Sequence, residues 1–145
     1  MTKEISTTSP KFIILEGVDR SGKGSMQNAI DKATKYKHFV MDRGPIGFMT
    51  YCVLFNKPKD LYTEYQHMEN VFSQIPNILM IYLTASTEEL IDRCIRTNHE
   101  ILDFDLHKKV YESYVKASKI PSITIDTTEK HVDEIVQDLI KEGIL

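Results

Sequence analysis

The sequence predicts an α/β fold: a three-layer α/β/α architecture in which helices cover both faces of a small, about four-stranded parallel sheet. Short apolar runs alternate with amphipathic helical stripes along the chain, and the first apolar run leads straight into a glycine-rich turn. Alternating strands and helices are typical of an open parallel sheet with right-handed crossovers. At 145 residues, with 41% hydrophobic and 27% charged residues, the composition is that of a folded globular domain.

The first half of the chain predicts two strands and three helices. An apolar run at 12–15 is followed, after the turn, by an amphipathic helix that continues to about residue 36. A second strand at 38–42 leads through a Gly-Pro turn into a helix at 48–55. A longer helix at 61–74 has its apolar residues on one face.

The second half repeats the alternation. Residues 78–83 are six consecutive apolar residues and give the clearest buried strand. Ser86 and Glu89 form a capping box, which predicts that the next helix begins there. The remaining predicted elements are the rest of that helix to about 97, a helix at 106–117, a strand at 122–125 and a helix at 132–140.

The N-terminal segment differs in composition from the rest. Residues 1–11 are polar and rich in Ser and Thr, and we expect them to be a flexible leader to a single domain at 12–145. They contain no apolar stretch of the kind that directs secretion, and no later stretch reaches membrane-spanning length. We therefore expect a cytoplasmic protein with no membrane partner. The net charge of −3 and the scattered basic residues argue against nucleic acid as a partner.

A phosphate-binding loop is predicted directly after the first strand. Gly17 and Gly22 bracket four residues and Lys23 follows, which is the Gly-x4-Gly-Lys spacing of a Walker A motif. Glycine allows backbone N–H groups to approach phosphate oxygens, and the lysine can reach the β and γ phosphates. The predicted ATP-binding run is Gly17, Val18, Asp19, Arg20, Ser21, Gly22, Lys23, Gly24 and Ser25.

A magnesium site is predicted beside this loop. Gly24 stands where a Walker A motif usually has the Ser or Thr that binds Mg²⁺, and a hydroxyl comes one residue later, at Ser25. Asp42 ends the second predicted strand, and ligands gather at the carboxyl ends of parallel strands. Asp42 and Ser25 are therefore the candidate ligands of the Mg²⁺ that would accompany ATP.

These motifs resemble those of the thymidylate kinase and deoxynucleoside kinase group. Residues 16–23 are similar to the thymidylate kinase loop, and residues 40–43, Val-Met-Asp-Arg, resemble the family's strand that ends in an Asp-Arg pair. The resemblance spans 12–140. The chain is a shortened version, because the strand and two helices that the family inserts between loop and pair are missing. That region carries much of the family's base recognition. The acceptor base could therefore be held by a partner subunit, or by Phe48, Tyr51 and the helix at 61–75.

The resemblance implies a P-loop kinase form of the three-layer fold, and an ATP-dependent kinase that converts a deoxynucleoside monophosphate to the diphosphate. Lys23 and Arg20 would contact the transferring phosphoryl group, and Arg43 would bind the acceptor's phosphate. Asp19 matches the position that contacts the acceptor sugar. Glu16 matches the carboxylate that takes the acceptor's proton in deoxynucleoside kinases; with a monophosphate acceptor it would orient groups instead.

Two arginines precede a short segment that could close over ATP as a lid. Arg93 and Arg96 lie one turn apart on a predicted helix, directly before Thr-Asn-His at 97–99. They are candidate ATP-binding residues. The alternative is that both are exposed and interact favourably with the C-terminal end of the helix dipole.

Three alternatives to the proposed activity stay open at the level of sequence. The acceptor could be a deoxynucleoside, or a polynucleotide or modified base. The chain could instead be a nucleotide-binding interaction module without catalysis. By analogy with the family, a homodimer through the helices at 46–75 is a further expectation.

Overall fold

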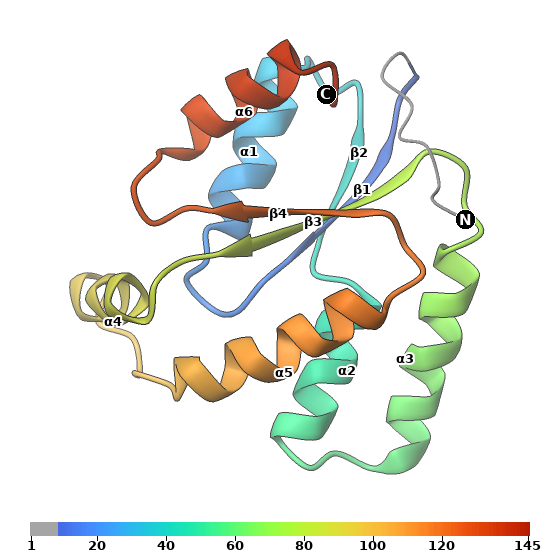
Figure 1. Ribbon diagram of the computed structural model, residues 1–145, viewed down its shortest axis with the longest axis vertical. Helices are drawn as coiled ribbons and strands as arrows, with labels where there is room; N and C mark the ends of the chain where they lie inside the picture. Colours follow the sequence, from blue (N-terminus) through green and yellow to red (C-terminus); the bar gives the residue numbers. More distant parts are fainter. Residues whose placement is uncertain (1–8) are drawn as a thin grey trace.

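The computed structural model describes residues 9–145, and they form a three-layered α/β unit (Figure 1). All four strands are parallel, in the order β2-β1-β3-β4. This confirms the predicted fold class. In chain order the elements are β1 (Phe12–Glu16), α1 (Lys23–Ala33), β2 (Phe39–Asp42), α2 (Pro45–Leu54), α3 (Lys59–Phe72), β3 (Ile78–Thr84), α4 (Thr87–Arg96), α5 (Phe104–Ala117), β4 (Ser122–Asp126) and α6 (Val132–Lys141).

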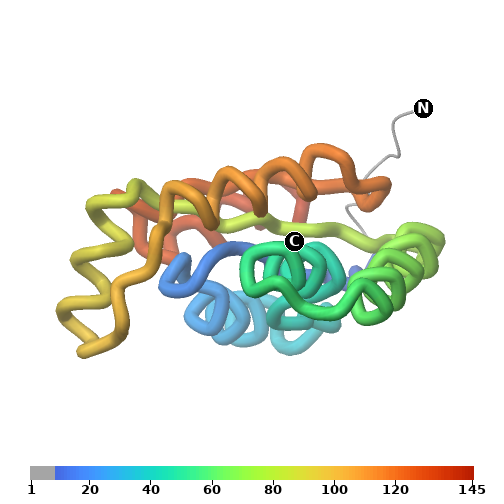
Figure 2. Tube along the Cα trace, turned by 90° about the horizontal axis from the view of Figure 1, so that it is seen from below, coloured from blue at the N-terminus to red at the C-terminus, as the bar shows by residue number. Residues whose placement is uncertain are grey.

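Each face of the sheet carries its own apolar core. Successive residues of a strand point to opposite faces, so Ile13 and Leu15 of β1 pack under α1 and α6, whereas Ile14 packs toward α2, α4 and α5. β3 lies in the middle of the sheet and is buried along almost its whole length. Viewed from the end that carries α2 and α5, α4 and α3 lie at opposite ends of the molecule (Figure 2).

Helix boundaries differ from the sequence predictions by two or three residues. α1 ends at Ala33 rather than near 36, because Lys35 and Tyr36 have φ values of 52° and 60° that no α-helix contains. α2 begins at Pro45 rather than at 48. Proline suits the first helical position, since its φ is already helical and its missing N–H would have had no partner.

The N-terminal segment is only partly described. Residues 1–8 of the predicted leader lie outside the described residues. Lys11, at the end of that segment, is buried, and its backbone N–H donates to Nδ1 of His38 at 2.9 Å. Within 9–145, no helix combines the length and the apolar character that crossing a membrane requires.

Candidate active site

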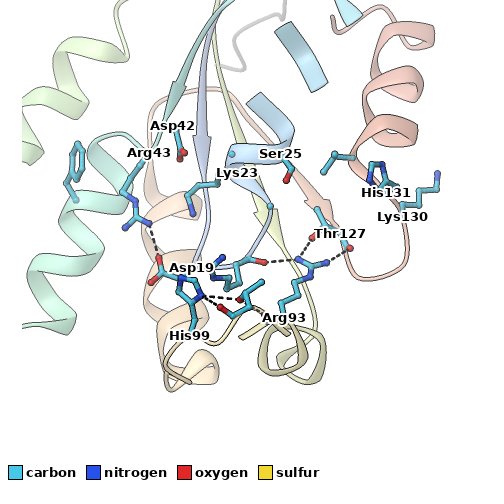
Figure 3. Close-up of a pocket in the computed structure, with 16 residues that line it drawn as sticks. Asp19, Lys23, Ser25, Asp42, Arg43, Arg93, His99, Thr127, Lys130 and His131 are labelled. Carbon is cyan, nitrogen blue, oxygen red and sulfur yellow. Dashed lines mark hydrogen bonds and ion pairs between the residues drawn. The ribbon is translucent and has the colours of Figure 1, made fainter. Parts of the chain in front are cut away.

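A cavity of about 890 Å³ lies at the carboxyl ends of the strands. Five segments contribute its walls: the glycine-rich loop at 17–22 with the start of α1, the end of β2, α2 through Phe48, the end of α4 with the loop after it, and the β4–α6 loop (Figure 3). Parallel sheets place ligands at this edge. The lining residues are Asp19, Arg20, Gly22, Lys23, Gly24, Ser25, Asp42, Arg43, Phe48, Arg93, Thr97, His99, Thr127, Lys130, His131 and Val132.

The glycine-rich loop needs both of its glycines. Gly17 has φ 150°, and a Cβ there would lie 2.5 Å from the carbonyl oxygen of Leu83 and from Oγ of Ser21. Gly22 has φ 105°, in the region that side-chain-bearing residues avoid. The loop thus turns tightly over the end of β3 and then enters α1.

Lys23 lies folded back over this loop. Its ammonium donates to the carbonyl oxygens of Gly17 at 2.8 Å and Val18 at 3.2 Å, and the residue is only 8% exposed. Burial, together with the charge of Arg43, lowers the pKa of Lys23 to about 8, and Asp42 opposes the shift. A buried ammonium with so few anionic partners would gain free energy from an anion in the cavity.

Arg43 and Asp19 form an ion pair on one wall of the cavity. Nη2 of Arg43 lies 3.2 Å from Oδ1 of Asp19 (Figure 3). The guanidinium carbon lies 4.3 Å from the ring centroid of Tyr51. Tyr51 itself is not among the lining residues, whereas Phe48, one turn earlier on α2, is. The ring and the carboxylate fix the direction of the Arg43 fork, and its remaining N–H groups can donate to two oxygens of an anion.

Glu16 lies outside the cavity and is fully buried. Its carboxylate accepts hydrogen bonds from the N–H groups of Gly44 at 3.2 Å and Gly47 at 2.9 Å, and from the Tyr111 hydroxyl at 2.7 Å. Burial raises the pKa of Glu16, and these hydrogen bonds oppose the shift. The N-cap residue of α2 is Gly44, and no side-chain hydrogen bond from that residue caps the helix. Glu16, at the end of β1, caps α2 instead by accepting from the N–H groups of Gly44 and Gly47. Glu16 was considered either as the base that takes the acceptor's proton or as a residue that orients other groups, and this geometry favours the second role.

Arg93 and Arg96 separate in the structure. Arg93 lines the cavity, and its guanidinium donates to Glu89, to the carbonyl oxygen of Arg20 and to Thr127. Arg96 is 59% exposed, pairs with Glu89 and Asp92, and is not among the lining residues. Only Arg93 is therefore placed to influence a bound ligand.

Two oxygen donors lie where the sequence predicts a magnesium site. Asp42 and Ser25 both line the cavity beside Lys23 (Figure 3). Among residues 9–145 there is no cluster of three His, Cys, Asp or Glu side chains that could hold a metal by itself. Mg²⁺ characteristically takes one or two protein oxygens together with substrate phosphates and water, and a carboxylate with a hydroxyl fits that requirement.

The β4–α6 loop is the part of the site that the sequence analysis missed. Thr127, Lys130, His131 and Val132 all line the cavity. The position of this loop in the sequence could have indicated its role, because it follows the carboxyl end of a predicted parallel strand. Three residues of the predicted ATP-binding run do not line the cavity: Gly17, Val18 and Ser21. Val18 packs in the core.

The comparisons place the fold among solved structures. No family model and no curated protein matches the chain. The structure is similar to the YorR protein from Bacillus subtilis, crystallised in complex with phosphorylated GDP, with a TM-score of 0.69 and 18% identity over 91% of this chain and 95% of that one. A protein from Chloroflexus aurantiacus provisionally described as a kinase aligns over 92% and 96% of the two chains at 13% identity, with a TM-score of 0.43. The likeness to YorR shows that the two chains share a fold.

Proposed function

We propose that this chain is a phosphotransferase that uses MgATP to convert a deoxynucleoside monophosphate to the diphosphate, as thymidylate kinases do. One observation carries the proposal: Lys23 at the end of the glycine-rich loop and Arg43 at the end of β2 line the same cavity. A cation on each side of a shared space is what transfer of a phosphoryl group between two phosphate-bearing molecules requires.

The donor would lie on the glycine-rich loop. Phosphoryl transfer depends mainly on positioning and on neutralising negative charge, so few side chains need to take part chemically. Lys23 and Arg20 would contact the transferring group, and the N–H groups at the start of α1 would hold the neighbouring phosphates. Mg²⁺, held by Asp42 and Ser25, would supply further charge neutralisation at those phosphates.

The acceptor would lie against Arg43, Asp19 and Phe48. A monophosphate offers the pair of anionic oxygens to which the planar Arg43 fork can donate two hydrogen bonds. A deoxynucleoside acceptor, the second candidate, would need Glu16 as a general base within reach of its hydroxyl. Because Glu16 is buried and both of its oxygens already accept hydrogen bonds, the monophosphate is the better supported acceptor.

Two further observations support a nucleotide as the ligand. A volume of about 890 Å³ is near the upper end of the range for small-molecule sites, which leaves room for both donor and acceptor. The similar YorR protein was crystallised with phosphorylated GDP. Guanine nucleotides therefore belong in any substrate panel, both as donors and as acceptors.

The first test is a substrate panel. The purified protein is incubated with MgATP or MgGTP and with each common nucleoside, deoxynucleoside and deoxynucleoside monophosphate, and diphosphate release is followed, with Lys23→Met as the control. We expect turnover on at least one monophosphate and none in the control. Turnover only on nucleosides would favour the second candidate. If no compound of the panel causes diphosphate release although ATP binding is measurable, the proposal is contradicted. A polynucleotide acceptor or a non-catalytic module would then remain.

The second test concerns the acceptor's phosphate. Arg43→Ala should raise the KM for the monophosphate by about 10- to 100-fold, the effect of one lost charge-assisted contact, and should change the KM for ATP much less. Lys32→Ala, which removes an exposed cation from the last turn of α1, is the control for net charge. An Arg43→Ala enzyme with an unchanged acceptor KM would mean that Arg43 does not bind the acceptor.

A further inference from the structure

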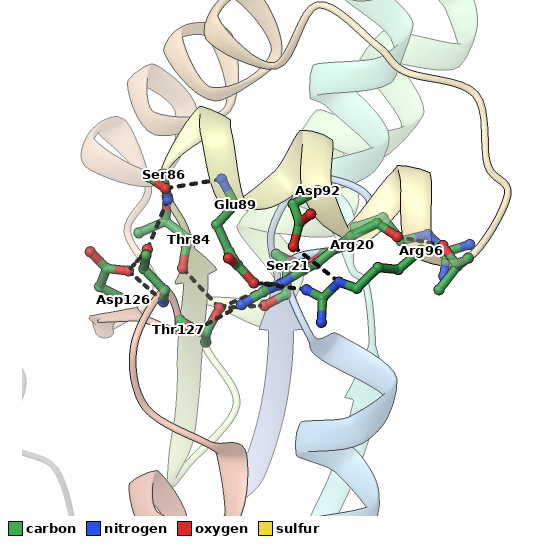
Figure 4. A network of polar contacts seen from close by, with 12 residues as sticks. Arg20, Ser21, Thr84, Ser86, Glu89, Asp92, Arg96, Asp126 and Thr127 are labelled. Carbon is green, nitrogen blue, oxygen red and sulfur yellow. Dashed lines mark hydrogen bonds and ion pairs between the residues drawn. The ribbon is translucent and has the colours of Figure 1, made fainter.

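The hydroxyl of Thr127 joins three parts of the molecule at the back of the cavity. The residue is 4% exposed, and its Oγ1 lies within hydrogen-bonding distance of two carbonyl oxygens, Ser21 at 3.0 Å and Thr84 at 3.1 Å. The same oxygen accepts a hydrogen bond from Nη1 of Arg93 at 3.1 Å. The glycine-rich loop, β3 and α4 thus converge on one side chain of the β4–α6 loop (Figure 4).

The contact with Ser21 controls the direction of a different group. A peptide unit is planar and trans, so the carbonyl of Ser21 and the N–H of Gly22 point in opposite directions. Because Thr127 holds the carbonyl at the back of the loop, the N–H of Gly22 is directed away from Thr127 and toward the front. Gly22 lines the cavity, and backbone N–H groups are what a phosphate-binding loop uses to bind anions.

Backbone sterics alone would not keep this peptide in place. A half-turn of the Ser21–Gly22 peptide would take φ of Gly22 from 105° to about −75°, a value that every residue adopts easily. The flipped loop would present a carbonyl oxygen to the cavity in place of the N–H. The hydrogen bond from Thr127 opposes that change, since a flip would take the Ser21 carbonyl away from the hydroxyl and leave it only the Thr84 carbonyl, which already accepts from the backbone N–H of Thr127 at 2.7 Å.

The preceding peptide is held in a similar way. Nη1 of Arg93 donates to the carbonyl oxygen of Arg20 at 2.8 Å, and Nη2 donates to the backbone oxygen of Thr127 at 2.7 Å. Arg20 itself has φ 68°, which an arginine rarely adopts. Two consecutive carbonyls of the loop are therefore held from behind by Thr127 and Arg93.

We propose that Thr127 is a positioning residue for the phosphate cradle: its hydroxyl locks the Ser21–Gly22 peptide in the orientation that binds the donor's phosphates. This inference rests on the proposed function, since it takes a polyphosphate as the ligand of the loop. It adds to that function a residue of the β4–α6 loop that acts on the phosphates through the backbone rather than by contact.

The test separates the hydroxyl from the shape of the side chain. Thr127→Val keeps the branched shape and removes the hydroxyl, whereas Thr127→Ser keeps the hydroxyl. Thr128→Val is the control, because it makes the same change at the neighbouring threonine. The Thr128 hydroxyl bonds to Asp126 and Ser86 and not to the glycine-rich loop. Affinities for ATP and for inorganic tripolyphosphate are measured by titration calorimetry. Thr127→Val should weaken both about ten-fold, the effect of one lost phosphate donor, whereas the other two variants should stay near wild type. If Thr127→Val does not fold, Thr127→Ala carries the same expectation.

Each outcome decides between the two proposals. Equal affinities in wild type and Thr127→Val, or an equal loss in Thr127→Ser, would overturn the positioning role and leave the kinase proposal intact. A lower melting temperature with unchanged affinity of the folded protein would show that Thr127 is merely structural. A weakened tripolyphosphate affinity in a protein that phosphorylates no acceptor would support the positioning role and contradict the kinase. A wild-type protein that binds neither ATP nor tripolyphosphate would overturn both.

Discussion

Replacing Lys23 by Met should stabilise the free protein at neutral pH while abolishing phosphate transfer. The ammonium of Lys23 is almost completely buried, and burial together with the nearby Arg43 lowers its pKa to about 8. Keeping that lysine charged at pH 7 therefore costs the folded state free energy. A binding site that holds an unneutralised charge is less stable than the same site without it.

The size of the effect follows from two opposing contributions. The pKa falls from 10.5 to about 8, and at about 1.4 kcal/mol per pH unit the 2.5-unit difference amounts to about 3 kcal/mol. Methionine removes this cost but leaves the carbonyls of Gly17 and Val18 without their donor, a loss of about 1 kcal/mol each. We expect Lys23→Met to be more stable than wild type by about 1 kcal/mol at pH 7.

The advantage should disappear in alkali. Between pH 8 and 10.5 the unfolded chain binds the Lys23 proton more tightly than the folded protein does, so the wild type gains stability as the pH rises through this window. Methionine has no such dependence. The stability difference should therefore shift toward the wild type by about 2 kcal/mol between pH 8 and 9.5, and should change sign near pH 9.

Urea unfolding of both proteins at pH 7, 8, 9 and 9.5 measures this difference directly, because other titrating groups are common to the two chains. Lys32→Met, which removes an exposed lysine from the same helix, controls for the loss of one positive charge. A Lys23→Met protein that is less stable than wild type at pH 7, or a difference that does not vary with pH, would refute the reasoning.

Three further substitutions test how the loop and α2 are packed around the site. Glu16→Gln should lower the free energy of unfolding by about 2 kcal/mol, because both carboxylate oxygens accept hydrogen bonds and the amide nitrogen that replaces one of them cannot. A large loss of turnover at unchanged stability would instead identify Glu16 as a general base. Gly24→Ala should raise the free energy of unfolding by about 0.5–1 kcal/mol, since a Cβ there meets nothing within 4 Å. Its counterpart Gly47→Ala should lower it by about 1–3 kcal/mol, since that Cβ would lie 2.7 Å from Oε1 of Glu16. Urea unfolding with parallel turnover assays checks all three, and a destabilised Gly24→Ala or an unaffected Gly47→Ala would contradict the packing described for the loop and α2.

The sequence by itself predicted the architecture and the position of the glycine-rich loop. Strand and helix positions follow from the spacing of apolar residues within about ten positions of one another, so they were predicted to within two or three residues. The Gly-x4-Gly-Lys spacing is also local. It placed the cavity's main segment at the end of β1, where the structure has it. Asp42 and Arg43 reach the same cavity because they end a parallel strand.

Only the tertiary structure decided what several of these residues do. Glu16 receives a hydrogen bond from Tyr111, which lies 95 residues away, and Ser21 receives one from Thr127, which lies 106 residues away. Arg93 and Arg96 have similar sequence surroundings, yet only Arg93 reaches the loop. Such partnerships depend on the order of the strands and on how α4, α5 and the β4–α6 loop pack against β1. Those contacts join residues far apart in the chain, and no local pattern of residues encodes them.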